Sequence, residues 1–105
     1  MKKFVNLVTK VPLGEAERPH CLYSDLATAC LNNRPQQGFT PEELFTRLAV
    51  LKRLDARGPL EVIELEDAEA AKLLVCVNEM TWGMLSTDIG EFVTAMRTEL
   101  VKTIK

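Results

Sequence analysis

The chain has 105 residues, of which 47% are hydrophobic and 27% charged, and its formal net charge at pH 7 is −2. This length gives one domain with a single core, and the composition is that of a globular protein rather than a disordered one. The longest unbroken apolar run, Leu73 to Val77, is too short for a transmembrane helix, and the small net charge excludes a general attraction to nucleic acid or membranes.

Cysteine usage and the first ten residues indicate the compartment. The start MKKFVNLVTK is basic, but Asn6, Thr9 and Lys10 interrupt its apolar part and no small-residue cleavage site follows, so it does not read as a signal peptide. The 3 cysteines form no C-x-x-C pair, which argues against a disulfide framework. We therefore expect a cytoplasmic protein.

The first third of the chain reads as a strand and a short helix. Residues 4–9 are rich in strand formers and are stopped by Pro12 and Gly14, and residues 13–20 read as a loop. A helix follows from about residue 24, capped by Ser24 or Asp25. It ends before Pro35, because the residue before a proline is disfavoured in the helical region.

The clearest local signal is the helix start at Thr40. Thr40 is the predicted N-cap, Pro41 occupies the first helical position, and Glu43 is predicted to complete a capping box. The helix ends at Gly58-Pro59. An apolar face is expected to run through Leu44, Phe45, Leu48, Leu51 and Leu54, while the bases occupy the other faces.

The second half reads as a strand and two helices. Residues 60–65 alternate as a half-buried strand does, and residues 4–9 are the expected partner. The next helix leaves to water only a stripe through Glu69, Lys72, Cys76 and Glu79, so we expect it to be central. Trp82 is predicted to fill the corner before the last helix, with an exposed anchor for a partner as the alternative. Ser86 or Thr87 is the predicted cap of that helix.

The last helix has the sharpest amphipathic pattern. Its predicted core face contains Ile89, Phe92, Val93, Met96 and Leu100. Val101 and Ile104 extend this apolar character, either as core or as an exposed stripe that pairs with another copy. The predicted fold is a mainly helical α+β single domain, residues 1–105, with four helices and a minimal two-stranded sheet in the order β-α-α-β-α-α.

Residues that could carry catalysis or bind a metal are sparse. His20 is the single histidine, and its neighbour Cys21 is expected to point away from it. His20, Cys21 and Cys30 do not make up the four ligands of a zinc site, and Cys30 and Cys76 are interpreted as small apolar core residues. We therefore predict no enzyme activity, no cofactor and no metal.

Acidic charge is concentrated in one part of the chain. Residues 58–91 contain eight acids and one base. Their pattern follows strand alternation and helix starts, which is typical of a solvated face, and the alternative is a docking surface for a basic protein partner. The candidate partner-binding residues are Glu61, Glu64, Glu66, Asp67, Glu69 and Glu79.

DNA binding is the alternative function. Residues 67–102 read as two helices joined by a corner, as in a helix-turn-helix, but the second helix starts with Asp88 and Glu91, which would repel phosphates. The more basic helix 41–57 could serve a DNA-associated transcriptional regulator. Its candidate DNA-binding residues are Arg47, Lys52, Arg53 and Arg57.

Taken together, the element order resembles that of small uncharacterised accessory proteins of tailed bacteriophages and prophages. The stretches that carry the resemblance are LYSDLATACL, TPEELFTRLAVLKRL and VIELEDAEAAKLL, followed by the amphipathic last helix. The resemblance implies a phage or prophage origin, a place in the host cytoplasm, and a non-enzymatic accessory or assembly factor. The main functional hypothesis is therefore protein–protein contact, including self-association as a homodimer, without nucleic acid or membrane.

Overall fold

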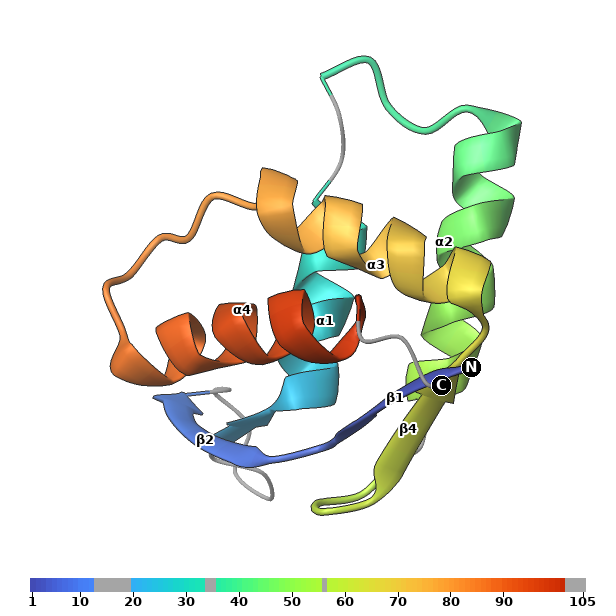
Figure 1. Cartoon of the computed structure of the whole chain (residues 1–105). Helices are drawn as coiled ribbons and strands as arrows, with labels where there is room; N and C mark the ends of the chain where they lie inside the picture. Colours follow the sequence, from blue (N-terminus) through green and yellow to red (C-terminus); the bar gives the residue numbers. More distant parts are fainter. Residues whose placement is uncertain (13–19, 34–35, 56, 102–105) are drawn as a thin grey trace.

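Four helices lie on one side of two short β-ribbons (Figure 1). The computed structural model describes residues 1–12, 20–33, 36–55 and 57–101. In chain order the elements are β1 (Lys2–Val5), β2 (Val8–Pro12), β3 (His20–Leu22), α1 (Tyr23–Asn32), α2 (Pro41–Leu54), β4 (Val62–Leu65), α3 (Asp67–Glu79) and α4 (Thr87–Glu99). The α+β class and the four helices are as predicted.

The expected ribbon is present, together with a second one. β1 pairs antiparallel with β4, which confirms the predicted partnership of the two segments. The predicted strand 4–9 breaks at Asn6, however, and the chain continues as β2, which pairs antiparallel with β3. His20, expected in a loop, is the first residue of β3, and residues 13–19 lie outside the described residues. The prediction of a single two-stranded sheet was therefore wrong.

Asn6 explains why the strand breaks. Its side chain is fully buried, and its Oδ1 accepts the backbone N–H of Ser24 at 2.7 Å. Its Nδ2 donates to Ser24 Oγ at 3.1 Å and to the carbonyl oxygens of Arg57 and Gly58 at 3.3 and 3.1 Å. These bonds hold Asn6 inward against the start of α1 and the turn before β4, and the in–out alternation fails directly after it, where Leu7 and Val8 are both exposed.

The same contacts correct the prediction for the first helix. α1 has Leu22 as its N-cap residue, rather than Ser24 or Asp25. Asn6, from another segment, accepts one of the first helical N–H groups, and Asp25 folds back to accept the N–H of Leu22 at 2.7 Å. At α2 the Thr40 cap is confirmed, since Thr40 Oγ1 accepts the N–H of Glu43 at 3.2 Å, but the Glu43 carboxylate bonds to Arg47 and Lys72 instead of closing a capping box.

The core lies where α3 packs against α1, α2 and α4. Ile89, Phe92, Met96 and Leu100 of the last helical segment are buried, as the periodicity predicted. Leu100 therefore belongs to the core rather than to a self-pairing stripe, while Val101 is exposed and residues 102–105 lie outside the described part.

α3 is rotated slightly from its predicted orientation. Cys76 is buried, which agrees with its interpretation as a small core residue but not with its place on the predicted solvent stripe, and Val75, expected inside, is 47% exposed. Trp82 is partly buried and meets the Phe92 ring edge-on, with the ring centroids 6.2 Å apart. This places Trp82 against the core at the corner between α3 and α4.

Candidate functional site

The six acidic candidate residues do not form one surface. Glu61 lies just before β4 and Glu64 lies on it. At the start of α3 lie Glu66, Asp67 and Glu69, and Glu79 is the last residue of that helix. At 1.5 Å per residue, the two ends of α3 are roughly 20 Å apart. The acidic cluster of the sequence is therefore divided among three places.

Half of these acids already have partners. Arg53 Nε lies 3.1 Å from Glu69 Oε1, its Nη2 lies 3.8 Å from Glu66, and the N-terminal ammonium lies 3.4 Å from Asp67. Such exposed pairs add little stability, but they reduce the negative charge offered to a basic partner. The start of α3 is consequently a weaker acidic site than its sequence indicates.

The four basic candidate residues are also separated. Arg53 forms an ion pair with Glu69 of α3. Arg57 Nε donates to the carbonyl oxygen of Arg53 at 3.2 Å, and Lys52 is exposed on α2. Arg47 is only 7% exposed. A DNA-binding face needs its bases in reach of phosphates, and the structure withdraws Arg47 from any such face.

Arg47 is the buried centre of a charged cluster between α1, α2 and α3, whose other two charged members, Glu43 and Lys72, are partly exposed. Its Nε donates to Glu43 Oε1 at 2.8 Å, and its Nη1 donates to the carbonyl oxygens of Leu31 and Asn33 at 2.8 and 3.2 Å. The guanidinium stacks over the Phe39 ring, 4.9 Å from its centroid. Arg47 thus closes the C-terminal end of α1, where carbonyl groups lack helical donors.

Lys72 completes this cluster from α3. Its Nζ lies 2.8 Å from Glu43 Oε2. Hydrogen bonds from Lys72 and Arg47 lower the pKa of the Glu43 carboxyl below its ordinary value, so this group stays ionised at neutral pH. The cluster joins α2 to α3 through the Glu43 carboxylate and to the end of α1 through the Arg47 guanidinium.

Replacing Arg47 with methionine should lower the free energy of unfolding by about 2–3 kcal/mol, because the Leu31 carbonyl loses its donor and Glu43 loses one of two cations. Urea denaturation followed by circular dichroism measures this. The matched control is Arg97→Met, which removes an exposed hydrogen bond to Asn78 and should change stability by less than about 0.5 kcal/mol. Equal effects of the two changes would show that Arg47 is solvated.

Burial of Arg47 reverses the expected orientation of α2. The helix buries Arg47, Val50 and Leu54, whereas the residues predicted to face the core are 42% (Leu44), 68% (Phe45) and 42% (Leu48) exposed. We call Leu44, Phe45 and Leu48 the α2 stripe. The predicted core face of this helix was therefore wrong except at Leu54 and, in part, at Leu51.

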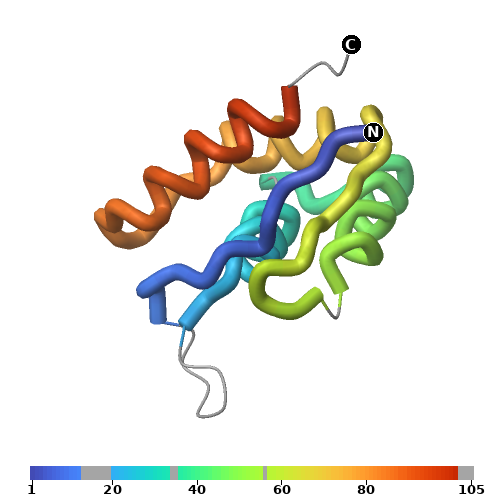
Figure 2. Tube along the Cα trace, turned by 60° about the horizontal axis from the view of Figure 1, so that its bottom comes forward, coloured from blue at the N-terminus to red at the C-terminus, as the bar shows by residue number. Residues whose placement is uncertain are grey.

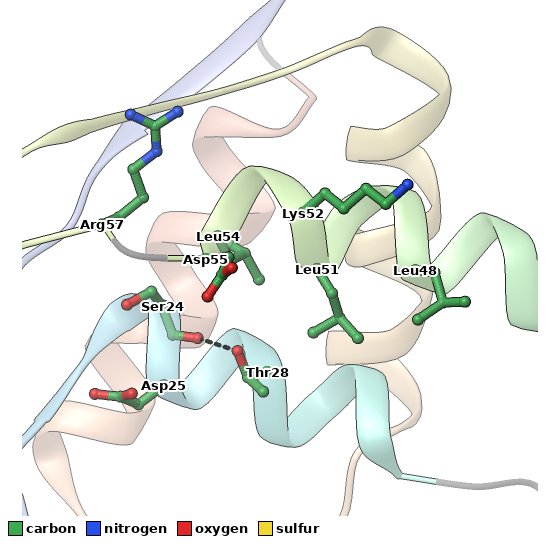
Figure 3. A pocket seen from close by; sticks show the side chains of 9 residues that line it. All are labelled: Ser24, Asp25, Thr28, Leu48, Leu51, Lys52, Leu54, Asp55 and Arg57. Carbon is green, nitrogen blue, oxygen red and sulfur yellow. Dashed lines mark hydrogen bonds between the residues drawn. The ribbon is translucent and has the colours of Figure 1, made fainter.

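A cleft of about 410 Å³ adjoins the α2 stripe, between α1 and α2 (Figure 3). Leu48 and Leu51 point from α2 toward α1, where Thr28 donates its hydroxyl to the carbonyl oxygen of Ser24 at 2.7 Å. The wall from α2 is apolar and the rim is charged with both signs. The lining residues are Ser24, Asp25, Thr28, Leu48, Leu51, Lys52, Leu54, Asp55 and Arg57.

The cysteines and the histidine do not meet in a reactive arrangement. His20 is exposed, while Cys21, Cys30 and Cys76 are buried and form no disulfide with one another. Burial raises the pKa of the Cys30 thiol to about 12 and also raises the pKa of Cys76. Both thiols are therefore protonated at neutral pH, as core residues are expected to be.

Cys30 and Cys76 should stay unlabelled by an aromatic disulfide reagent at pH 8 in the native protein and react in denaturant. Only the thiolate attacks such reagents, and a pKa of about 12 leaves roughly one thiol in ten thousand ionised at this pH. Mass spectrometry of the labelled peptides reads each site separately. Rapid native labelling of either cysteine would contradict the burial described here.

Sequence reasoning missed the α2 stripe because apolar residues surround much of this helix. Val50 and Ala49 lie between the residues assigned to the core, so the sequence offers two apolar faces. A signal that favours the observed face is the pair Glu43 and Arg47, four residues apart, which can neutralise each other on burial.

None of the described helices is long and apolar enough to span a membrane. Comparison of the chain with protein-family models, with curated protein sequences and with solved structures gives no match.

Proposed function

We propose that this protein is a non-enzymatic interaction module, an accessory or assembly factor of the phage or prophage type, that binds a helix of a protein partner on the α2 stripe and in the adjoining cleft. The observation that carries the proposal is the orientation of α2, with an arginine inside and a phenylalanine and two leucines outside. Positions where a buried charge or an exposed apolar side chain departs from the usual pattern of burial are most often functional sites.

The shape and chemistry of this surface support a helical partner. An apolar row of Leu44, Leu48 and Leu51 repeats at four and three residues along α2, which is the spacing by which two helices pack. The cleft beside it separates α1 from α2 and has Asp55 and Lys52 at its rim. Charges of both signs would fix the direction in which the partner helix lies.

The residues available for chemistry support a binding role rather than a catalytic one. The thiols of Cys30 and Cys76 are held protonated by burial, and the exposed His20 begins β3, which leads into the end of α1 opposite to Cys30. Glu43, the carboxyl with a shifted pKa, is shifted downward by its cations, whereas a general acid needs the opposite shift.

The proposal is tested with the double variant Phe45→Asp/Leu48→Asp. Affinity purification from the host cell, quantified by isotope labelling, should recover a partner with the wild-type chain and at least tenfold less of it with this variant. Because both side chains are exposed, the variant should keep the wild-type melting temperature.

The matched control is Met84→Asp/Leu85→Asp, which adds the same charge at positions 47% and 104% exposed in the connection before α4. It should recover the partner at the wild-type level. The proposal is wrong if the α2 variant retains the partner, or if the control variant alone loses it.

A further inference from the structure

The outer face of the β1–β4 ribbon is a second, separate apolar surface. In Figure 2 the two strands run side by side in front of α1 and α2, with α4 beside β1. Phe4 and Ile63 are paired on the inner face and are buried. On the outer face Lys3 lies opposite Glu64, and Val5 (43% exposed) lies opposite Val62 (47% exposed).

Leu60 extends this face in a strained conformation. It is the one described non-glycine residue with a positive φ, +65°, and its side chain is 67% exposed. The Glu61 N–H bonds to the Gly58 carbonyl oxygen at 3.3 Å, so Leu60 occupies the third position of a β-turn, where a left-handed conformation favours glycine. Folding alone gives no reason for an exposed leucine here, and such outliers point to function.

A groove lies beside the same face. It has a volume of about 330 Å³ and a mainly apolar lining drawn from β1 and the residues after it, β4, α4 and the first residue of α1, with charged residues at its rim. Leu7 is 41% exposed and lines this groove. Leu60 lies close to it, because the N–H of Leu60 donates to the carbonyl oxygen of Asn6, the residue before Leu7, at 2.8 Å. The lining residues are Lys3, Phe4, Val5, Leu7, Tyr23, Val62, Ala95 and Glu99.

We propose that this face binds a second copy of the chain, with the strained Leu60 of each copy packed against Leu7 in the groove of the other. The twofold axis of this homodimer runs parallel to the strands, over the midline between β1 and β4. Such a rotation leaves each residue at the same height along the ribbon and places β4 of one copy over β1 of the other. Each β1 residue therefore faces, in the second copy, the β4 residue with which it pairs in its own ribbon.

The register makes the face complementary to itself under this rotation. Val5 meets Val62 of the second copy, and Lys3 meets Glu64, while the reverse contacts repeat on the other side of the axis. Within the described chain, neither Lys3 nor Glu64 forms an ion pair, so both charges are available. Face-to-face packing would also bury a two-stranded ribbon in a four-stranded sandwich, the arrangement in which such ribbons become stable.

The size of the face sets the expected strength. The six residues Lys3, Val5, Leu7, Leu60, Val62 and Glu64 form the centre of an interface, whereas standard interfaces use roughly 20–30 residues a side. We therefore expect a dissociation constant in the micromolar range. Sedimentation equilibrium from micromolar to submillimolar concentration should show the mass of the wild-type chain rising from 11.8 kDa toward twice that value.

Charge exchange gives the decisive test. Lys3→Glu places two acids against two acids in the dimer, and Glu64→Lys places two bases against two bases, so each variant alone should dimerise at least about tenfold more weakly. An equimolar mixture of the two variants should restore association, because every contact then joins an acid to a base. When one variant is isotope-labelled so that the three possible dimers differ in mass, native mass spectrometry should show the mixed dimer as the predominant dimeric species.

Leu60→Gly separates the interface from the fold. This variant should melt at or above the wild-type temperature, because glycine relieves the left-handed strain, yet it should dimerise more weakly. The control Leu85→Gly removes a fully exposed leucine elsewhere and should dimerise as the wild type does.

Four results would overturn the proposal: a wild-type chain that stays monomeric at submillimolar concentration, single charge variants that associate like the wild type, a mixture that fails to restore association, or a Leu60→Gly variant with unchanged association. Loss of the dimer in Phe45→Asp/Leu48→Asp with retention in the ribbon variants would instead place self-association on the α2 stripe. Failure of the ribbon dimer leaves the partner test on α2 unaffected, because the two surfaces share no residue.

Discussion

Replacing Phe92 with alanine is expected to lower the free energy of unfolding by about 3–5 kcal/mol. Phe92 is 0% exposed and lies on the face of α4 that packs into the core. Its ring meets Tyr23 edge-on, with centroids 5.1 Å apart, and meets Trp82 in the same way at 6.2 Å. The change therefore removes apolar burial, leaves a cavity and breaks two aromatic contacts.

Urea denaturation followed by circular dichroism measures this loss, and tryptophan emission reports it a second time because Trp82 is the single tryptophan and touches the lost ring. The matched control is Val75→Ala on the exposed side of α3, which should cost less than about 1 kcal/mol. A loss below about 1 kcal/mol at Phe92 would place this ring in solvent.

The elements that periodicity defines most sharply were predicted most accurately. α4 was predicted with its buried face because Ile89, Phe92, Met96 and Leu100 follow a single helical stripe with polar residues opposite. The β1–β4 pairing was predicted because alternation marked both segments and few other partners were available. In these elements local pattern and tertiary packing agree.

α2 shows where pattern alone is insufficient. Apolar residues occupy two of its faces, and the choice between them depends on Arg47, which finds acceptors on α1 and a carboxylate on its own helix. A buried arginine is acceptable only when the surrounding structure supplies such partners. Because the carbonyl acceptors of Leu31 and Asn33 come from the end of α1, the sequence of α2 alone does not determine which of its two apolar faces is buried.

Composition predicted which residues are acidic, but it could not predict how far apart these residues lie on the surface. Composition located eight acids within residues 58–91 but gave no distances, and α3 places Glu79 far from Glu66 and Asp67. The surfaces that carry our proposals instead contain apolar residues, Phe45 and Leu48 on α2 and Val5 and Leu60 on the ribbon. Such residues resemble core residues in a sequence and are recognised as surface only when burial is known.

β2 and β3 were missed for a related reason, and Asn6 is again a residue whose role depends on distant partners. Residues 4–9 read as one continuous strand, because nothing in the local sequence indicates that Asn6 is buried. In the structure Asn6 connects the break between β1 and β2 to the start of α1 and to the turn before β4. We therefore expect this residue to contribute more to stability than its type suggests.

Replacing Asn6 with alanine should lower the free energy of unfolding by roughly 3–4 kcal/mol. The buried Ser24 N–H loses its acceptor at the start of α1, and the partly buried carbonyl oxygens of Arg57 and Gly58 lose their donor. An unsatisfied buried polar group costs about 1–3 kcal/mol, and these losses occur together.

Asn6→Asp separates the two roles of the amide, because aspartate keeps the acceptor for Ser24 but has no donor for the carbonyl oxygens of Arg57 and Gly58. It should also destabilise the fold, and more so above pH 5 than below pH 3, since a buried carboxylate beside two carbonyl oxygens is unfavourable in its charged form. The control Asn78→Ala loses one exposed hydrogen bond to Arg97 and should stay within about 0.5 kcal/mol of the wild type. If Asn6→Ala is equally mild, the break between β1 and β2 does not depend on this side chain, and some other feature must hold the ribbons against α1.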